Sequence, residues 1–162
     1  SRVFKNGAGG KKIAALIKPR INSATQGIII SFGGNDGGAG VESLIATVKN
    51  APIYKTDPSK IVFLGPPPAY NPTDYDYARR VFKGKKGYNP ANWSKLNNKR
   101  KGYNEKIKQA VEAAGMTFIS PYDYIGNETV GGKDGVHLNS KLAKQFVSSI
   151  IDQLPSKTKS VA

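Results

Sequence analysis

The feature that most constrains the fold is an alternation along the chain between short apolar runs and longer segments with helical periodicity. A continuous β-branched run bounded by glycine or proline is typical of a strand buried on both faces. The strand-like runs are "RVF" (2–4), "QGIIISF" (26–32), "KIVFLG" (60–65) and "MTFIS" (116–120). Helical segments follow them in turn, at 11–18, 41–49, 94–115 and 140–154. This order predicts an α/β fold, a three-layer α/β/α sandwich around a mainly parallel sheet.

The long helical segment 94–115 carries its own start and stop signals. Ser94 is a candidate N-cap and Gly115 a candidate C-cap. Its expected inner face is formed by residues at helical spacing, namely Leu96, Tyr103, Ile107, Ala110, Val111 and Ala114. The preceding segment, 69–94, is rich in Tyr, Asn, Pro and Lys, so we expect it to be irregular.

Positive charge is concentrated in one part of the chain. The formal net charge is +14, and from Arg79 to Lys106 ten Lys or Arg residues stand against a single acid, Glu105. Such a cluster favours a polyanionic partner, which is nucleic acid, a cell-wall or capsule polymer, or an acidic protein. A solvated face that keeps the protein soluble fits the same composition equally well.

The counts of two residue types exclude several kinds of site. The chain has no cysteine, so disulfides, thiol nucleophiles and thiolate metal sites are excluded. With a single histidine as well, the composition argues against zinc. No run approaches the roughly 18 uncharged apolar residues of a membrane span, so we expect no such span.

Polar and glycine-rich segments follow the predicted strands. In open parallel sheets the functional loops lie beyond the carboxyl ends of the strands. The segments at these positions are "NGAGG" (6–10), "GGND" (33–36), "GPPPAY" (65–70) and, after the last strand, the loop with "DGVH" (134–137). We therefore expect all four to gather at one edge of the sheet.

Asp134 stands three residues before His137 on the turn into the last helix. At this spacing a carboxylate can reach the imidazole, select its tautomer and stabilise the imidazolium formed when histidine takes a proton. The pair is therefore a candidate catalytic dyad for acyl transfer. The competing interpretation is an ordinary exposed histidine near a helix N-terminus, and for this motif alone that is the commoner case.

Two further segments offer donors to a developing oxyanion. In "GGND" the amide of Asn35 can point a donor toward the cleft, and the glycines of "NGAGG" can offer backbone N–H groups. An ordinary turn is the competing interpretation of "GGND", because glycine, asparagine and aspartate are common turn residues. "NGAGG" does not complete a phosphate-binding loop motif.

Taken together, these motifs resemble those of the SGNH (GDSL-type) hydrolase family over nearly the whole chain. "NGAGG" is similar to its second block, "SFGGND" to its third block, and "DGVH" to its last block. "IVFLGPPPA" is similar to the strand that precedes the substrate-side loop. The resemblance implies a flavodoxin-like sheet and an esterase that needs no metal or other cofactor, often acting on acetyl groups of carbohydrates.

The resemblance also implies roles for individual residues. His137 would be the general base and Asp134 its orienting partner. Asn35 would be a side-chain oxyanion donor, and Gly9 or Gly10 a backbone donor, since the alignment is uncertain by one residue. Gly34, Tyr70 and Trp93 are further candidate substrate contacts, the two aromatic residues because they are interleaved with Lys and Arg.

One block of the family is absent from these 162 residues. No G-D-S sequence, which would carry the serine nucleophile, occurs in the chain. In the family this block comes first in the chain, so it would lie upstream of Ser1. Its strand would lie in the sheet between the strands predicted at 2–4 and 26–32. We expect such a segment in the gene product, because without it two buried strand edges would lack partners. A cleaved and still docked segment would then be a partner of this chain.

The expected organisation is one SGNH hydrolase-like domain over residues 1–154, with a tail at 155–162. Residues 69–106 would form a basic, aromatic insertion on the substrate side, where tyrosine and tryptophan rings stack on sugars or bases. An ordinary loop packing its aromatic rings on the sheet fits the same residues equally well.

Two functions remain open at this point. The first is a serine esterase acting on a carbohydrate or cell-wall polymer, with a polyanionic glycan suiting the charge. The second is a non-catalytic SGNH-like module that binds glycan, nucleic acid or other virion proteins. The short blocks and lysine-rich loops resemble phage-encoded members of the family, which favours an extracellular or virion location over the cytoplasm.

Overall fold

The structure is a computed structural model of the chain. It describes residues 10–22, 26–31, 37–69, 71–83, 89–125 and 133–135, together with residues 141, 144, 145, 148 and 152. The chain divides into two compact units, which are described separately. Unit 1 comprises Ser1–Pro66, Tyr103–Ile119 and Leu154–Ala162, and unit 2 comprises Pro67–Gly102 and Ser120–Gln153. Whether residues 1–154 act as one domain stays a prediction, and the tail 155–162 lies outside the described residues.

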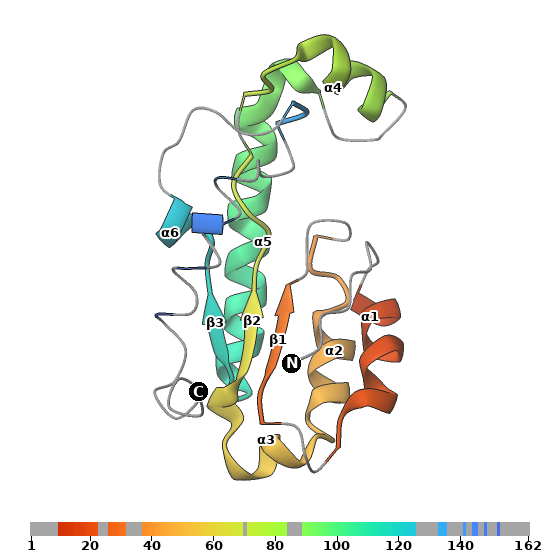
Figure 1. Ribbon diagram of the computed structural model, residues 1–162, viewed down its shortest axis with the longest axis vertical. Coiled ribbons are helices and arrows are strands. Elements are labelled where there is room, and N and C mark those ends of the chain that lie inside the picture. Colours follow the sequence, from red (N-terminus) through yellow and green to blue (C-terminus); the bar gives the residue numbers. More distant parts are fainter. Residues whose placement is uncertain are drawn as a thin grey trace. The chain divides into compact units, whose positions relative to one another are not determined.

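Unit 1 contains a parallel sheet whose strands lie in the order β1-β2-β3 (Figure 1). The strands are β1 (Ile28–Ser31), β2 (Ile61–Leu64) and β3 (Thr117–Ile119). Ile30 lies opposite Phe63, and Phe63 lies opposite Phe118. Parallel neighbours require crossover connections, which the helices between the strands provide. This confirms the predicted α/β fold with a parallel sheet, while the predicted strand 2–4 lies outside the described residues.

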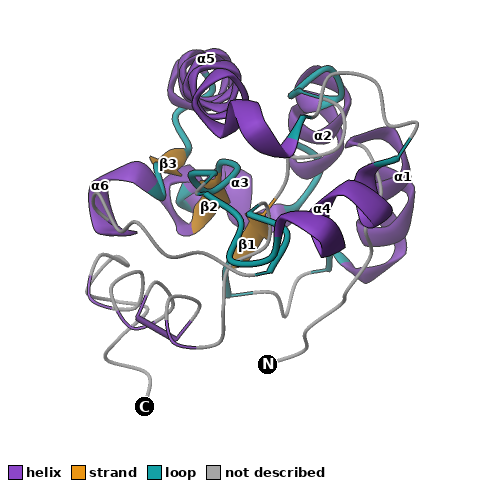
Figure 2. Cartoon of the chain, turned by 90° about the horizontal axis from the view of Figure 1, so that it is seen from above, coloured by secondary structure: helices purple, strands orange, loops and turns teal. Residues whose placement is uncertain are grey.

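One face of this sheet carries the hydrophobic core. Ile30, Ile61 and Phe63 pack there against α2 (Val41–Val48) and the second half of α5 (Trp93–Ala113). The helix α1 (Gly10–Ile17) packs against α2, and Figure 2 shows these helices over the sheet. The connection from α2 to β2 adds the short helices α3 (Pro52–Thr56) and η2 (Pro58–Lys60). Pro19 lies in the 3-10 turn η1 (Lys18–Arg20), where α1 ends as its sequence predicts.

The prediction that residues 26–32 form a strand buried on both faces is wrong in part. Ile30 is buried and Ile28 is partly buried, but Ile29 is 54% exposed. Side chains alternate between the two faces of a strand, so Ile29 points to the face opposite the core. In the part of the chain that the structure describes, Ile29 is the exposed residue of the apolar run and β1 pairs with β2 alone. An apolar run in the sequence does not show whether other segments pack on both faces of the strand that it forms.

The long helix α5 ends as its sequence predicts but begins differently. The Met116 N–H donates to Val111 O (3.1 Å) and the Gly115 N–H to Glu112 O (2.9 Å), the two bonds of a Schellman motif. Gly115 has φ 78°, which favours glycine. At the other end Ser94 is inside the helix rather than its N-cap, because the turn η3 (Pro90–Asn92) leads directly into Trp93. Asn89 caps that turn instead, through Ala91 N (3.0 Å).

Unit 2 corrects the prediction that residues 69–94 are irregular. Tyr75–Phe82 form the helix α4, and Asp74 is its N-cap, accepting from Tyr77 N at 2.9 Å. An aspartate at this position satisfies one of the N–H groups that the first turn leaves without intrahelical partners. The unit also contains α6 (Tyr122–Ile125). In the predicted last helix, the described residues Lys141, Lys144, Gln145, Ser148 and Asp152 are helical and exposed, as its polar face requires.

Candidate active site

Asp134, the predicted orienting carboxylate, is buried. It lies in a turn between Lys133 and Gly135, and only 6% of its surface is exposed. Gly135 has φ 75°, a conformation that costs other residues free energy and permits a tight turn. A solvated surface charge would stay in water, whereas a buried carboxylate must be held by polar partners. The burial of Asp134 therefore argues against the view that this motif is an ordinary surface turn.

The turn of Asp134 is joined to α4 within unit 2. The Asp74 N–H donates to Lys133 O at 3.2 Å, while the Asp74 side chain caps α4. The Lys133 ammonium lies 5.7 Å from the centre of the Tyr77 ring, within the range of a cation–π contact. The basic, aromatic segment and the turn with Asp134 are thus neighbours in the structure.

The other predicted catalytic residues are placed only in part. His137, Asn35, Gly34 and Gly9 lie outside the described residues, so their roles stay predictions. Gly10 is described and is the first residue of α1. Backbone N–H groups in the first turn of a helix have no partner within the helix, which suits the donor role that the resemblance implies.

The described half of the loop after β1 is a turn packed on α5. Gly37 and Gly38 have φ 62° and 82°. A Cβ atom on Gly37 would lie 2.9 Å from Tyr103 Cε1, and one on Gly38 would lie 3.1 Å from Ile107 Cγ1. Both glycines are therefore required by close packing as well as by backbone conformation. They hold the end of the loop whose earlier part contains Asn35.

The loop after β2, which the resemblance places on the substrate side, is held by polar side chains of α5. Within unit 1, Asn104 Nδ2 donates to Pro66 O at 2.9 Å. Within unit 2, Arg100 Nη1 donates to Pro67 O at 2.9 Å, and the Ala69 N–H donates to Asn97 Oδ1 at 3.2 Å. Proline has no N–H, so this loop cannot extend the sheet in the usual way, and α5 supplies partners for its carbonyl groups.

Sequence reasoning missed Arg100 and Asn104, which are both buried. A signal was present, because they are four residues apart and share a helical face with Leu96, Ile107 and Val111. Ile107 and Val111 are fully buried, which confirms the centre of the predicted inner face. Polar residues on such a face indicate that the helix contacts backbone groups as well as apolar side chains.

The predicted substrate-contacting residues are separate in the chain. Trp93 begins α5 and is half-buried in unit 2, while Tyr70 lies outside the described residues. Their contact with substrate stays a prediction. Asn97, near Trp93, also accepts from the Tyr122 hydroxyl through its carbonyl O at 3.0 Å and through its Oδ1.

The described residues offer neither a metal-binding cluster nor a helix that could span a membrane. No three His, Cys, Asp or Glu side chains among them are grouped in a way that would hold a metal ion. Their helices include none with the length and apolar character needed to cross a membrane.

Comparison with known proteins gives structural likeness without sequence likeness. No family model matches the sequence, and no curated protein matches it significantly. A carbohydrate acetylesterase from Sinorhizobium meliloti has a similar structure, with a TM-score of 0.60 and 17% identity over 94% of this chain and 70% of that one. A phospholipase A1 from Streptomyces albidoflavus has a TM-score of 0.57 and 16% identity, over 93% of this chain and 78% of that one.

A second carbohydrate acetylesterase family member from Sinorhizobium meliloti has a TM-score of 0.53 and 11% identity over 94% of this chain and 71% of that one. At these identities the likeness shows the fold alone. This chain therefore has an α/β fold, with a parallel three-stranded sheet flanked by helices, that is similar to the structures of SGNH-type esterases.

Proposed function

We propose that this protein is a serine ester hydrolase of the SGNH type that removes acyl groups, above all acetyl groups, from a carbohydrate or cell-wall polymer. The observation that carries the proposal is the burial of Asp134 three residues before the single histidine. It occurs in a fold similar to those of carbohydrate acetylesterases. A buried carboxylate at this spacing suits the orientation of His137.

The chemistry follows from the residue types. The hydroxyl of a serine in a G-D-S block upstream of Ser1 attacks the ester carbonyl carbon, and His137 takes the hydroxyl proton. The Asp134 carboxylate stabilises the imidazolium that forms. The Asn35 amide and the N–H of Gly9 or Gly10 hold the oxyanion, where each donor contributes about 3 kcal/mol to the transition state. His137 returns the proton to the leaving alcohol, and water then releases the acid from the acyl-enzyme.

The second candidate is a binding module without catalysis. It is favoured by the exposed basic surface of unit 2. In this case the buried Asp134 would serve only to stabilise its turn.

The test uses protein expressed from the complete coding sequence and compares hydrolysis of p-nitrophenyl acetate by four forms. We expect His137→Ala and Asp134→Asn each to lose at least about 100-fold in kcat/KM relative to the parent protein. Asp123→Asn is the matched control, because Asp123 is exposed in the same unit and should leave the rate unchanged. A fluorophosphonate probe, which labels activated serines, should label the parent and lose that labelling in His137→Ala.

Equal rates in the parent and His137→Ala would remove the catalytic proposal. The absence of both hydrolysis and labelling would establish the module in its place.

A further inference from the structure

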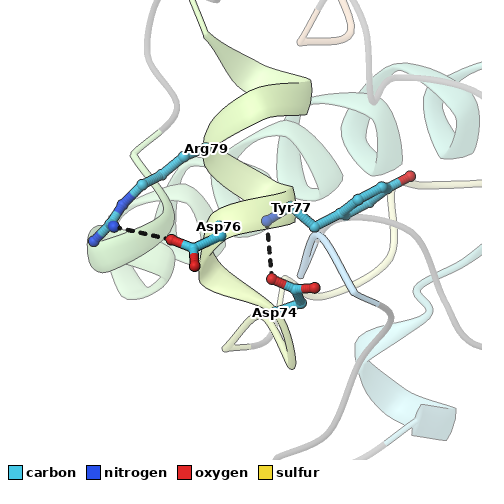
Figure 3. Close-up of polar contacts among 4 residues, drawn as sticks. All are labelled: Asp74, Asp76, Tyr77 and Arg79. Atoms are coloured by element: carbon cyan, nitrogen blue, oxygen red, sulfur yellow. Dashed lines mark hydrogen bonds and ion pairs between the residues drawn. The ribbon is translucent and has the colours of Figure 1, made fainter.

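The helix α4 presents an aromatic and basic surface to solvent. Its Ala78 is fully buried, but Tyr75 and Tyr77 are 39% and 36% exposed. Arg79 and Arg80 are exposed on the same helix. Figure 3 shows the Tyr77 ring and the Arg79 guanidinium extending to opposite sides of the helix, whereas Arg80, three residues after Tyr77, lies on the side of Tyr77. Tyrosine rings exposed in this way offer an apolar face and a hydroxyl to a ligand.

The positive charge continues into the first half of α5. The turn η3 lies beside α4 and leads directly into α5, whose Lys95, Lys99 and Lys101 are exposed. Only two acids, Asp74 and Asp76, occur in residues 67–102. Asp74 caps α4, and Asp76 pairs with Arg79 at 3.5 Å. We call the exposed aromatic and basic side chains of α4 and of the first half of α5 the basic-aromatic surface. They are Tyr75, Tyr77, Arg79, Arg80, Lys95, Lys99 and Lys101.

The basic-aromatic surface is connected to the turn that carries the predicted catalytic carboxylate. The carbonyl of Lys133 accepts a hydrogen bond from Asp74 N at 3.2 Å, and the Lys133 ammonium lies over the Tyr77 ring at 5.7 Å. The next residue is the buried Asp134. A ligand chain lying along α4 would therefore reach the neighbourhood of Asp134 within the same unit.

We propose that the basic-aromatic surface binds a carbohydrate polymer bearing anionic groups, carboxylate or phosphate, and delivers its ester groups to the catalytic turn. This rests on the proposed esterase function and names its substrate class. Arginine and lysine match the anionic groups, and tyrosine rings pack on sugar rings. Nucleic acid offers rings and phosphates too, but it has no carboxylic ester for the adjacent site. Contact between this surface and the Asp134 turn therefore favours a glycan.

The affinity of such a surface depends on salt. Exposed charges are screened beyond about 8 Å at physiological ionic strength, so charge-driven binding weakens as salt rises. Ring stacking depends much less on salt, and it should remain as the residual affinity.

The experiment measures binding by the full chain carrying His137→Ala, which prevents turnover. The probes are acetylated polygalacturonate, a glycerol-phosphate teichoic acid, neutral acetylated dextran, inorganic polyphosphate and a single-stranded oligonucleotide. We expect one of the two anionic glycans to bind at least about tenfold more tightly than dextran and polyphosphate. Which of the two binds identifies carboxylate or phosphate as the anionic group. Tighter binding of the oligonucleotide than of either glycan would overturn the proposal.

Variants then locate the surface. R79Q/R80Q should weaken glycan binding about tenfold, because it removes the Arg80 charge on the side of Tyr77 and the Arg79 charge on the other side of the same helix. K55Q/K108Q removes the same charge from exposed positions of unit 1 and should leave binding unchanged. Tyr77→Ala should weaken binding about fivefold, and Tyr77→Phe should restore it, since the ring is what stacks.

Equal loss in the two double variants would mean nonspecific charge attraction and would overturn the proposal. Thermal unfolding of each variant separates lost contact from lost folding.

The two proposals fail in different ways. K55Q/K108Q, whose residues lie outside the basic-aromatic surface, should keep the hydrolysis rate of p-nitrophenyl acetate. Glycan binding without any hydrolysis of the small ester would contradict the esterase and keep the surface. Hydrolysis of the small ester without glycan binding would contradict the proposed surface and keep the esterase.

Discussion

Asn104 on α5 and Pro66 in the loop after β2 are joined by a hydrogen bond of 2.9 Å from Nδ2 to the proline carbonyl. Asn104 is buried, with 5% of its surface exposed. The adjacent Gly65 lies so close that a Cβ atom there would be 1.9 Å from Asn104 Oδ1. The chain leaving β2 is therefore fitted directly onto the amide of Asn104, and several variants test this fit.

Replacing Gly65 should destabilise the protein. In Gly65→Ala the new methyl group would overlap Asn104 and also approach Phe118 Cζ at 3.1 Å. We expect a loss of about 3 kcal/mol in the free energy of unfolding, measured in urea. Gly102→Ala is the control, because it has nothing within 4 Å in the interior of α5 and should gain about 1 kcal/mol. Equal effects would show that the close approach at Gly65 is not present.

The amide of Asn104 should be required as a hydrogen-bond donor. Asn104→Asp keeps the shape but sets a carboxylate oxygen against Pro66 O, so we expect a loss of about 2 kcal/mol in unfolding free energy. The same change at Asn98, which is exposed on the same helix, should have little effect. Stability unchanged at Asn104 would contradict the hydrogen bond to Pro66.

Arg100 should not be replaceable by lysine. Its guanidinium donates to Pro67 O from a buried position, and the ammonium of lysine differs in shape, hydration and donor geometry. Arg100→Lys should cost about 1–2 kcal/mol of unfolding free energy in chemical denaturation. Arg80→Lys, at an exposed position, should be neutral. Identical behaviour of the two variants would place Arg100 at the surface.

Substitutions at Gly115 should change stability through the backbone conformation at the end of α5 and not through a steric clash. Its φ is 78°, and a Cβ atom there would have Pro58 Cγ as its nearest neighbour at 3.6 Å, so the site has room but disfavours other residues. Gly115→Ala should cost about 1 kcal/mol of unfolding free energy. Gly115→Asn should cost less, because asparagine tolerates this conformation better. Calorimetric melting of both variants gives the order, and alanine more stable than asparagine would contradict the motif.

Features decided within a few residues could be predicted from the sequence. The fully buried strand β2, the strand β3, which is only partly buried, the amphipathic helices α1, α2 and α5, and the C-cap at Gly115 all follow from local pattern. The prediction failed at Ser94 and in 69–94, where competing turn signals hid the Asp74 cap and the helix α4. For the site, the motif with Asp134 was visible, but the placement of His137 and Asn35 is still a prediction.

By itself the sequence determined the order of the strands β1, β2 and β3 and of the helices α1, α2 and α5, because their periodicity is a property of neighbouring residues. Only the tertiary structure decided that Asp134 is buried, that Ile29 is exposed, and that Arg100 and Asn104 satisfy proline carbonyls. Burial and hydrogen-bond partners depend on segments far apart in the chain. Asn104 and Pro66, which are 38 positions apart, meet only because a helix returns along the strand that precedes it.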